Sequence, residues 1–141
     1  SIHLCTEEML DKFMRFEILT EYINGKIKEV TDHNESNKIN TAELINGRRL
    51  TNVGTFRAYI EAYLQNNSKI HPEMTFIIRQ LEPTDRGLPI QIYVFSNDID
   101  WVRYEGIQAD IFDHLLAIIP EFGLKVFQSP TGKDFSKLRS K

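Results

Sequence analysis

The sequence predicts one domain of the α+β class, in which helices and short strands follow a split β-α-β-β-α-β order. Three observations predict it. Apolar residues recur every three or four positions in three segments, which is the helical period. Two apolar runs, 74–81 and 89–96, flank a loop that contains proline and glycine, as in an antiparallel hairpin. The chain has 141 residues, of which 41% are hydrophobic and 26% charged, as in one folded domain.

The N-terminal part begins with a short strand at 1–5, where Ile2 and Leu4 alternate with other residues. Thr6 is expected to cap a helix over 7–31, with Gly25 marking a bend. The apolar residues of this helix share one face: Met9, Phe13, Phe16, Leu19, Ile23, Ile27 and Val30. Segment 32–47 is rich in asparagine and loses the apolar period, which predicts a long exposed loop.

A second helix is predicted to begin at a cap on Thr51 or Asn52 and to end near Asn66. Its buried stripe consists of Val53, Phe56, Ile60, Tyr63 and Leu64. The predicted hairpin strands 74–81 and 89–96 come next.

A third helix follows, for which Asn97, Asp98 and Asp100 are candidate caps. Its apolar stripe consists of Trp101, Tyr104, Ile107, Ile111, Leu115 and Ile118. Pro120 predicts a stop near Ile119, and Gly123 suits a left-handed C-cap. The segment 124–128 is predicted to be the last strand, and 131–141 to be a basic, flexible tail.

These elements predict a ferredoxin-like split sandwich, with the first two helices counted as one connection. The long first helix and the asparagine-rich loop are extra structure between the first two strands. Residues 1–130 are expected to form a single domain. One face of the sheet would pack on the helices and the other would be free for a partner.

Composition narrows the classes of function. The chain has 17 basic and 20 acidic residues, a net charge of −3, which disfavours binding to the phosphate backbone of nucleic acids. The only cysteine, Cys5, cannot form an internal disulfide, which fits a reducing compartment such as the cytoplasm. No apolar run approaches the roughly 20 residues of a membrane span. We therefore expect a soluble cytoplasmic domain.

Few residue patterns could carry chemistry. Asp110, Asp113 and His114 would project from one side of the third helix and could hold a metal ion, but a solvated helical face is the favoured interpretation. Cys5, beside a helix N-terminus, could be a reactive thiol with a lowered pKa, although a packed, inert cysteine is favoured. The glycines form no phosphate-binding loop. We predict no catalytic residues, no metal site and no cofactor.

Candidate contact residues form two groups. Trp101 and Tyr104, one helical turn apart, are expected to pack in the core or, alternatively, to anchor a protein interface, where such aromatic residues concentrate. Arg48 and Arg49 form a basic pair beside the second helix. Our prediction for a subunit interface is therefore Arg48, Arg49, Trp101 and Tyr104.

Five ordered motifs resemble one known family: RRLTNVGTFRAY (48–59), MTFIIRQL (74–81), GLPIQIYVF (87–95), YEGIQADIFDH (104–114) and PEFGLKVF (120–127). The sequence resembles the C-terminal cytoplasmic domain of the small-conductance mechanosensitive channel (MscS) family, in its YbdG-like, miniconductance branch. The resemblance is strong over 48–130 and loose over 1–30.

The resemblance implies part of an ion channel and not an enzyme. Seven copies of a family subunit form a hollow vestibule on the cytoplasmic side of the bacterial inner membrane. Membrane tension opens the pore, and osmolytes leave the cell during hypo-osmotic shock. The chain lacks the family's membrane helices and pore-lining helix, so it is expected to be a fragment of a longer protein.

Two other functions remain open from the residues alone. One is a free-standing ferredoxin-like domain that binds a ligand or regulates a partner, an idea based on fold analogy. The other is a metal-dependent enzyme that uses Asp110, Asp113 and His114.

Overall fold

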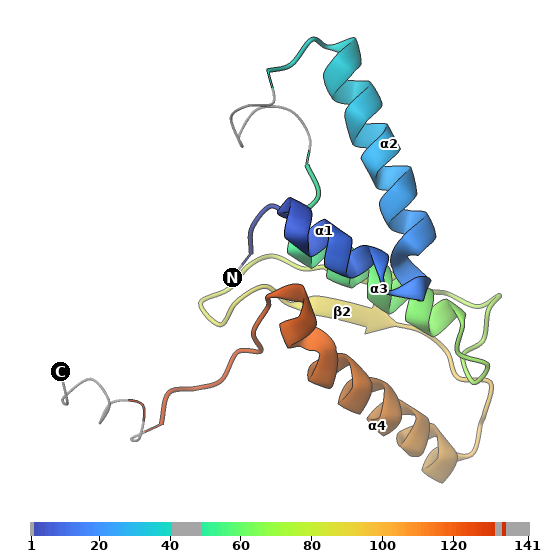
Figure 1. Ribbon diagram of the computed structural model, residues 1–141. Helices are drawn as coiled ribbons and strands as arrows, with labels where there is room; N and C mark the ends of the chain where they lie inside the picture. Colours follow the sequence, from blue (N-terminus) through green and yellow to red (C-terminus); the bar gives the residue numbers. More distant parts are fainter. Residues whose placement is uncertain (1, 41–48, 132–133, 135–141) are drawn as a thin grey trace.

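The fold combines helices with a small sheet, as the α+β prediction requires. A computed structural model describes residues 2–40, 49–131 and 134 (Figure 1). The order is α1 (Glu7–Met14), the 3-10 turn η1 (Glu17–Leu19), α2 (Thr20–Ser36), α3 (Asn52–Gln65), β1 (Ile77–Gln80), β2 (Ile90–Tyr93), α4 (Trp101–Ile118) and the 3-10 turn η2 (Ile119–Phe122). In Figure 1, α2 and the N-terminal end of α4 project away from the other described elements.

The predicted hairpin is confirmed. β1 and β2 pair antiparallel, with Ile78 opposite Ile92, and the described part of the chain contains no further strand in this sheet. An isolated bridge between Ile70 and Ser96 continues the pairing beyond the strands. Gly87, with φ of +117°, lies in the hairpin loop, where a residue without a Cβ is needed.

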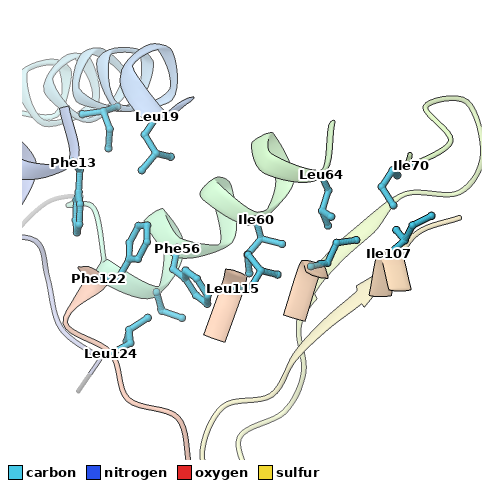
Figure 2. Packing of buried hydrophobic residues seen from close by; sticks show 13 residues of the cluster. Phe13, Leu19, Phe56, Ile60, Leu64, Ile70, Ile107, Leu115, Phe122 and Leu124 are labelled. Carbon is cyan, nitrogen blue, oxygen red and sulfur yellow. The ribbon is translucent and has the colours of Figure 1, made fainter. Parts of the chain in front are cut away.

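The core lies where α1, η1, α3, α4 and η2 meet, and Phe122 is at its centre (Figure 2). The Phe122 ring lies 5.2 Å from that of Phe13 and 5.1 Å from that of Phe56, measured between centroids. Phe13 and Phe122 are fully buried. A buried aromatic side chain contributes about 1.5–3 kcal/mol through its removal from water, so this cluster stabilises the packing of distant segments.

Asn52 is a polar residue inside this apolar core, and it is completely buried. Its Nδ2 donates to the carbonyl of Phe122 at 3.1 Å, and its Oδ1 accepts from the backbone N–H groups of His3 (3.1 Å) and Val53 (2.9 Å). The side chain therefore joins the N-terminal segment, α3 and η2. It also satisfies backbone groups that would otherwise be costly to bury.

The single helix predicted over 7–31 is wrong, because the chain breaks between α1 and α2. Phe16 has extended backbone angles, φ −84° and ψ +102°, and the Thr20 hydroxyl lies 3.3 Å from the Met14 carbonyl. The break directs Phe13, from one helix, and Leu19, from the turn after it, into the same core. Gly25 lies inside the continuous helix α2 and marks no bend there.

The predicted loop over 32–47 is helical at its start, since α2 continues to Ser36. Residues 41–47 of this loop lie outside the described residues. The same holds for residue 1 and for most of the predicted tail at 131–141, of which the structure describes 131 and 134.

The two outer predicted strands are not formed. Over its described residues, the first strand is reduced to an isolated bridge between Leu4 and Thr51. The Cys5 N–H donates to the Leu50 carbonyl at 2.8 Å, so this segment pairs with the chain entering α3 and not with the sheet. Segment 124–128 has no regular secondary structure, although Leu124 is buried.

The predicted helix boundaries are confirmed where capping residues define them. The Thr51 side chain accepts from the Gly54 N–H at 3.1 Å at the start of α3. Asp100 caps α4, which ends at Ile118, beside Pro120. Gly123 is left-handed, with φ of +66°, as predicted for a C-cap.

Candidate functional site

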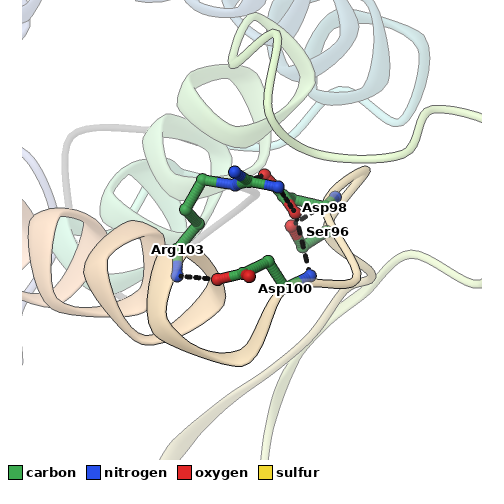
Figure 3. A network of polar contacts seen from close by, with 4 residues as sticks. All are labelled: Ser96, Asp98, Asp100 and Arg103. Atoms are coloured by element: carbon green, nitrogen blue, oxygen red, sulfur yellow. Dashed lines mark hydrogen bonds and ion pairs between the residues drawn. The ribbon is translucent and has the colours of Figure 1, made fainter.

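The turn between β2 and α4 is built from polar side chains (Figure 3). Asp100 Oδ1 accepts from the Arg103 N–H at 3.1 Å, which satisfies a free donor in the first turn of α4. Asp98 Oδ1 accepts from the Asp100 N–H at 2.9 Å, and Ser96 Oγ accepts from the Asp98 N–H at 3.0 Å. Each side chain therefore fixes the backbone two or three residues further along.

An ion pair closes this network. Arg103 Nε donates to Asp98 Oδ2 at 2.5 Å, and Arg103 Nη2 donates to Oδ1 at 3.2 Å, so that the contact is bidentate. The hydrogen bond from Arg103 lowers the pKa of Asp98, with a further contribution from the Asp100 N–H. The turn thus places the first residues of α4 in a defined orientation.

The first residues of α4 and Ile99, just before the helix, form an exposed apolar surface. We name this surface the α4 patch and define it as Ile99, Trp101, Val102 and Tyr104. Ile99 is fully exposed, Trp101 is 71% exposed and Val102 is 78% exposed. The Trp101 and Tyr104 rings lie 6.1 Å apart between centroids. A cluster of large apolar side chains in water is typical of a surface that contacts a partner.

The expectation that Trp101 and Tyr104 pack in the core is wrong, since both are exposed, and the alternative that they anchor a protein interface stays a prediction. The physical reason is the position of α4. Its first six residues are all exposed, and the buried stripe begins only at Ile107. Gly106 ends this exposed part, and nothing lies within 4 Å of the position a Cβ would take there.

The basic pair is not part of the α4 patch. Arg48 lies outside the described residues, so the structure does not place it. Arg49 is half-buried and lines a hollow with Cys5, Leu50 and residues of α2. No residue of α4 lines that hollow.

The three residues considered for a metal site do not form one within the described residues. His114 Nε2 lies 2.8 Å from the Tyr59 hydroxyl, and its ring stacks on Tyr63 with centroids 4.4 Å apart. Asp110 and Asp113 are exposed. Within residues 2–40, 49–131 and 134, no group of three or more histidine, cysteine, aspartate or glutamate side chains could hold a metal ion.

Cys5 is not an activated thiol. Burial raises its pKa, and a contact with the Thr55 hydroxyl at 3.9 Å opposes this effect only in part. At neutral pH the sulfur is therefore protonated and a poor nucleophile. The favoured interpretation of a packed, inert cysteine agrees with this raised pKa, whereas the alternative of a lowered pKa beside a helix N-terminus is wrong.

A second surface was not anticipated from the sequence. A groove of about 850 Å³, which we name the β2 groove, lies between β2, α4 and segment 124–128. Its walls include Ile90 and Ile92 of β2 and the half-exposed Phe112 and Leu116 of α4. A signal was present, since Phe112 and Leu116 each follow directly after a stripe residue and widen the apolar face of α4 beyond what a core requires.

No family model matches the sequence, and no solved structure matches the chain. Among the helices of the described ranges, none is both long and apolar enough to cross a bilayer.

Proposed function

We propose that the chain is the cytoplasmic vestibule domain of a mechanosensitive channel related to the MscS family, in which seven copies form a ring below the membrane pore. The motifs between residues 48 and 127 suggest this family. The described order of helices, hairpin and helix supports a ferredoxin-like split fold, because it contains the central helix–strand–strand–helix part of that pattern.

The α4 patch is the observation that carries the proposal. A cyclic ring with head-to-tail contacts needs each subunit to present two different surfaces. Trp101 and Val102 are exposed residues of the first turn of α4. In Figure 1 this end of the helix points away from the other described helices. Full burial of such side chains stabilises an interface by about 1.5–3 kcal/mol each. This patch is our candidate for one of the two ring contacts.

The first test is to read the coding sequence upstream of Ser1. A channel subunit requires several apolar segments of about 20 residues there, followed by a short β-rich stretch. A start codon within a few residues of Ser1 would contradict the channel function. It would favour the alternative of a free-standing ligand-binding or regulatory domain.

The second test addresses the patch in the full-length protein. We expect the double substitution Trp101→Asp, Val102→Asp to weaken assembly and to reduce survival of cells after hypo-osmotic shock. The matched control is Gln108→Asp, which adds a charge at another exposed position of the same helix. Unchanged assembly and survival in the double variant would remove the α4 patch as a ring contact.

A further inference from the structure

The β2 groove lies along the unpaired edge of the sheet. Its lining includes residues of β2 but none of β1, so it lies on the side of β2 that faces away from the hairpin partner. Apolar residues of α3, including Phe56 and Ile60, and Leu115 of α4 also contribute to its lining. The groove is therefore apolar in its depth and bordered by a strand.

The backbone of β2 can be assigned to its two edges from one hydrogen bond. The Leu81 N–H donates to the Pro89 carbonyl at 2.9 Å. Because hydrogen-bonded pairs alternate along an antiparallel ladder, Gln91 and Tyr93 also bond to β1, whereas Ile90 and Ile92 do not. The N–H and C=O groups of Ile90 and Ile92 point toward the open edge, where the described residues supply no third strand.

The opposite wall does not complete the sheet. Segment 124–128 contributes Lys125, Val126 and Phe127 to the groove, but it forms no bridge with β2. Val126 and Phe127 are about half exposed. Within the described residues, the groove thus combines a strand edge that no other strand pairs with and apolar side chains that remain in contact with water. These are the two features that strand addition uses.

The charges at the groove have one sign. Among the described residues, Arg86, in the hairpin loop, and Lys125 are the two charged ones that line the groove, and no carboxylate does. The positive charge of the described residues that line this groove is therefore complementary to an anionic group on a partner. A carboxylate on an otherwise apolar segment satisfies both the basic residues and the apolar depth.

We propose that the β2 groove binds an extended polypeptide strand of a partner, which pairs with Ile90 and Ile92, carries apolar residues at alternating positions and places a carboxylate near Arg86 and Lys125. The alternation follows from the strand period of two, which directs every second side chain into the groove. The backbone hydrogen bonds supply affinity, and the apolar and charged contacts supply selectivity.

The test uses residues 1–141 labelled with 15N and a short capped peptide in which valine alternates with threonine and the last threonine is replaced by aspartate. We expect the peptide to slow hydrogen exchange at the amides of Ile90 and Ile92. Gln91 and Tyr93, which already bond to β1, serve as an internal reference and should change little. The same peptide with N-methylated backbone amides should bind at least tenfold more weakly.

Variants separate the contributions of the groove. Phe112→Gln and Leu116→Gln lie on the half-exposed wall, so they should fold and should weaken peptide binding about tenfold. Ile99→Gln removes an exposed apolar side chain outside the groove and is the matched control. Arg86→Glu with Lys125→Glu should reverse the preference, so that a lysine-bearing peptide binds better than the aspartate one.

Four results would overturn the proposal. Equal binding of the N-methylated peptide would exclude strand pairing. Protection of Ile90 and Ile92 in the free protein at all concentrations would show that its own chain covers the edge. Protection that rises with protein concentration would indicate a second copy. Binding of the anionic amphiphile decanoate without binding of the peptide would assign the groove to a small molecule.

Discussion

At the scale of single residues, burial decides what the polar and ionisable side chains do. Asn52 is completely buried, and its amide joins three segments through hydrogen bonds. His114 contacts two tyrosines instead of carboxylates. Cys5 has a raised pKa because its surroundings exclude water. Each of these residues has a partner that is distant in sequence, and the chemistry of the residue follows from that partner.

Replacement of Asn52 should be among the most damaging polar changes in the described chain. Asn52→Ala leaves the Phe122 carbonyl and the His3 N–H without this partner inside the protein. We expect the free energy of unfolding to fall by about 2–4 kcal/mol, measured by urea denaturation. Asn66→Ala is the control, since its amide bonds the Ala62 carbonyl at an exposed position and its loss should cost well under 1 kcal/mol. Similar losses for both variants would contradict the joining role of Asn52.

At the scale of elements, the ends of the helices are determined by local chemistry. Thr6, Thr51 and Asp100 accept backbone N–H groups at the starts of α1, α3 and α4. Gly123 takes the left-handed conformation after η2. These contacts link residues within three or four positions of each other, so they form wherever the chain places the same residues in order.

Two glycines should respond to alanine with opposite signs. Gly25 lies inside α2 with open space around its Cβ position, so Gly25→Ala should stabilise the protein by about 0.5–1 kcal/mol. Gly123 has φ of +66°, so Gly123→Ala should destabilise it by about 1–2 kcal/mol. Thermal unfolding of both variants measures the difference. Stabilisation by Gly123→Ala would show that the left-handed cap is not formed.

The stabilisation of the turn before α4 by the Asp98–Arg103 ion pair should depend on pH. The pKa of Asp98 is lower in the folded protein than in the unfolded chain because Arg103 bonds to its carboxylate. The stabilisation is therefore present above the ordinary carboxyl pKa of about 4 and is lost as pH falls through the lowered folded value.

Thermal unfolding of wild type and Asp98→Asn over the range from pH 7 to pH 2 measures this contribution. The two proteins should differ most above about pH 4 and converge in stronger acid. Asp110→Asn, at an exposed position further along α4, is the control and should show no such convergence. A constant difference at every pH would mean that the Asp98–Arg103 pair does not stabilise the turn.

At the scale of the whole molecule, the α4 patch and the β2 groove are apolar surfaces that the described residues leave in contact with water. The patch lies at the start of a helix and is strongly exposed, which suits a contact between subunits. The groove is concave and follows a strand edge, which suits an extended segment. α4 contributes residues to both surfaces, and its buried stripe, which begins at Ile107, lies on the same helix.

The chain of 141 residues alone should be a monomer or a weak dimer, since the rest of a channel subunit would supply much of the assembly surface. Light scattering measures its mass, and a stable heptamer would contradict this prediction.

Trp101 is the only tryptophan, so its fluorescence reports directly on the patch. We expect emission typical of indole in water at low concentration, with a shift to shorter wavelength only where subunits associate.

Local signals in the sequence predicted much of the fold. Apolar period, caps and turn residues predicted α3, the hairpin and α4, including the ends at Thr51, Asp100 and Gly123. They failed between α1 and α2, where the apolar period continues although the helix is interrupted. The stripe from Met9 to Val30 is compatible with one helix, and only the packing of Phe13 and Leu19 into one core required the chain to turn at Phe16.

For the candidate site, the sequence by itself determined which residues were available: an aromatic pair at Trp101 and Tyr104, a lone cysteine, and a histidine near two aspartates. Only the tertiary structure decided what surrounds them. It left the aromatic pair in water, half-buried the thiol and placed two tyrosines beside His114. The reason is that capping and periodicity act over a few residues, whereas exposure depends on which distant segments cover a side chain.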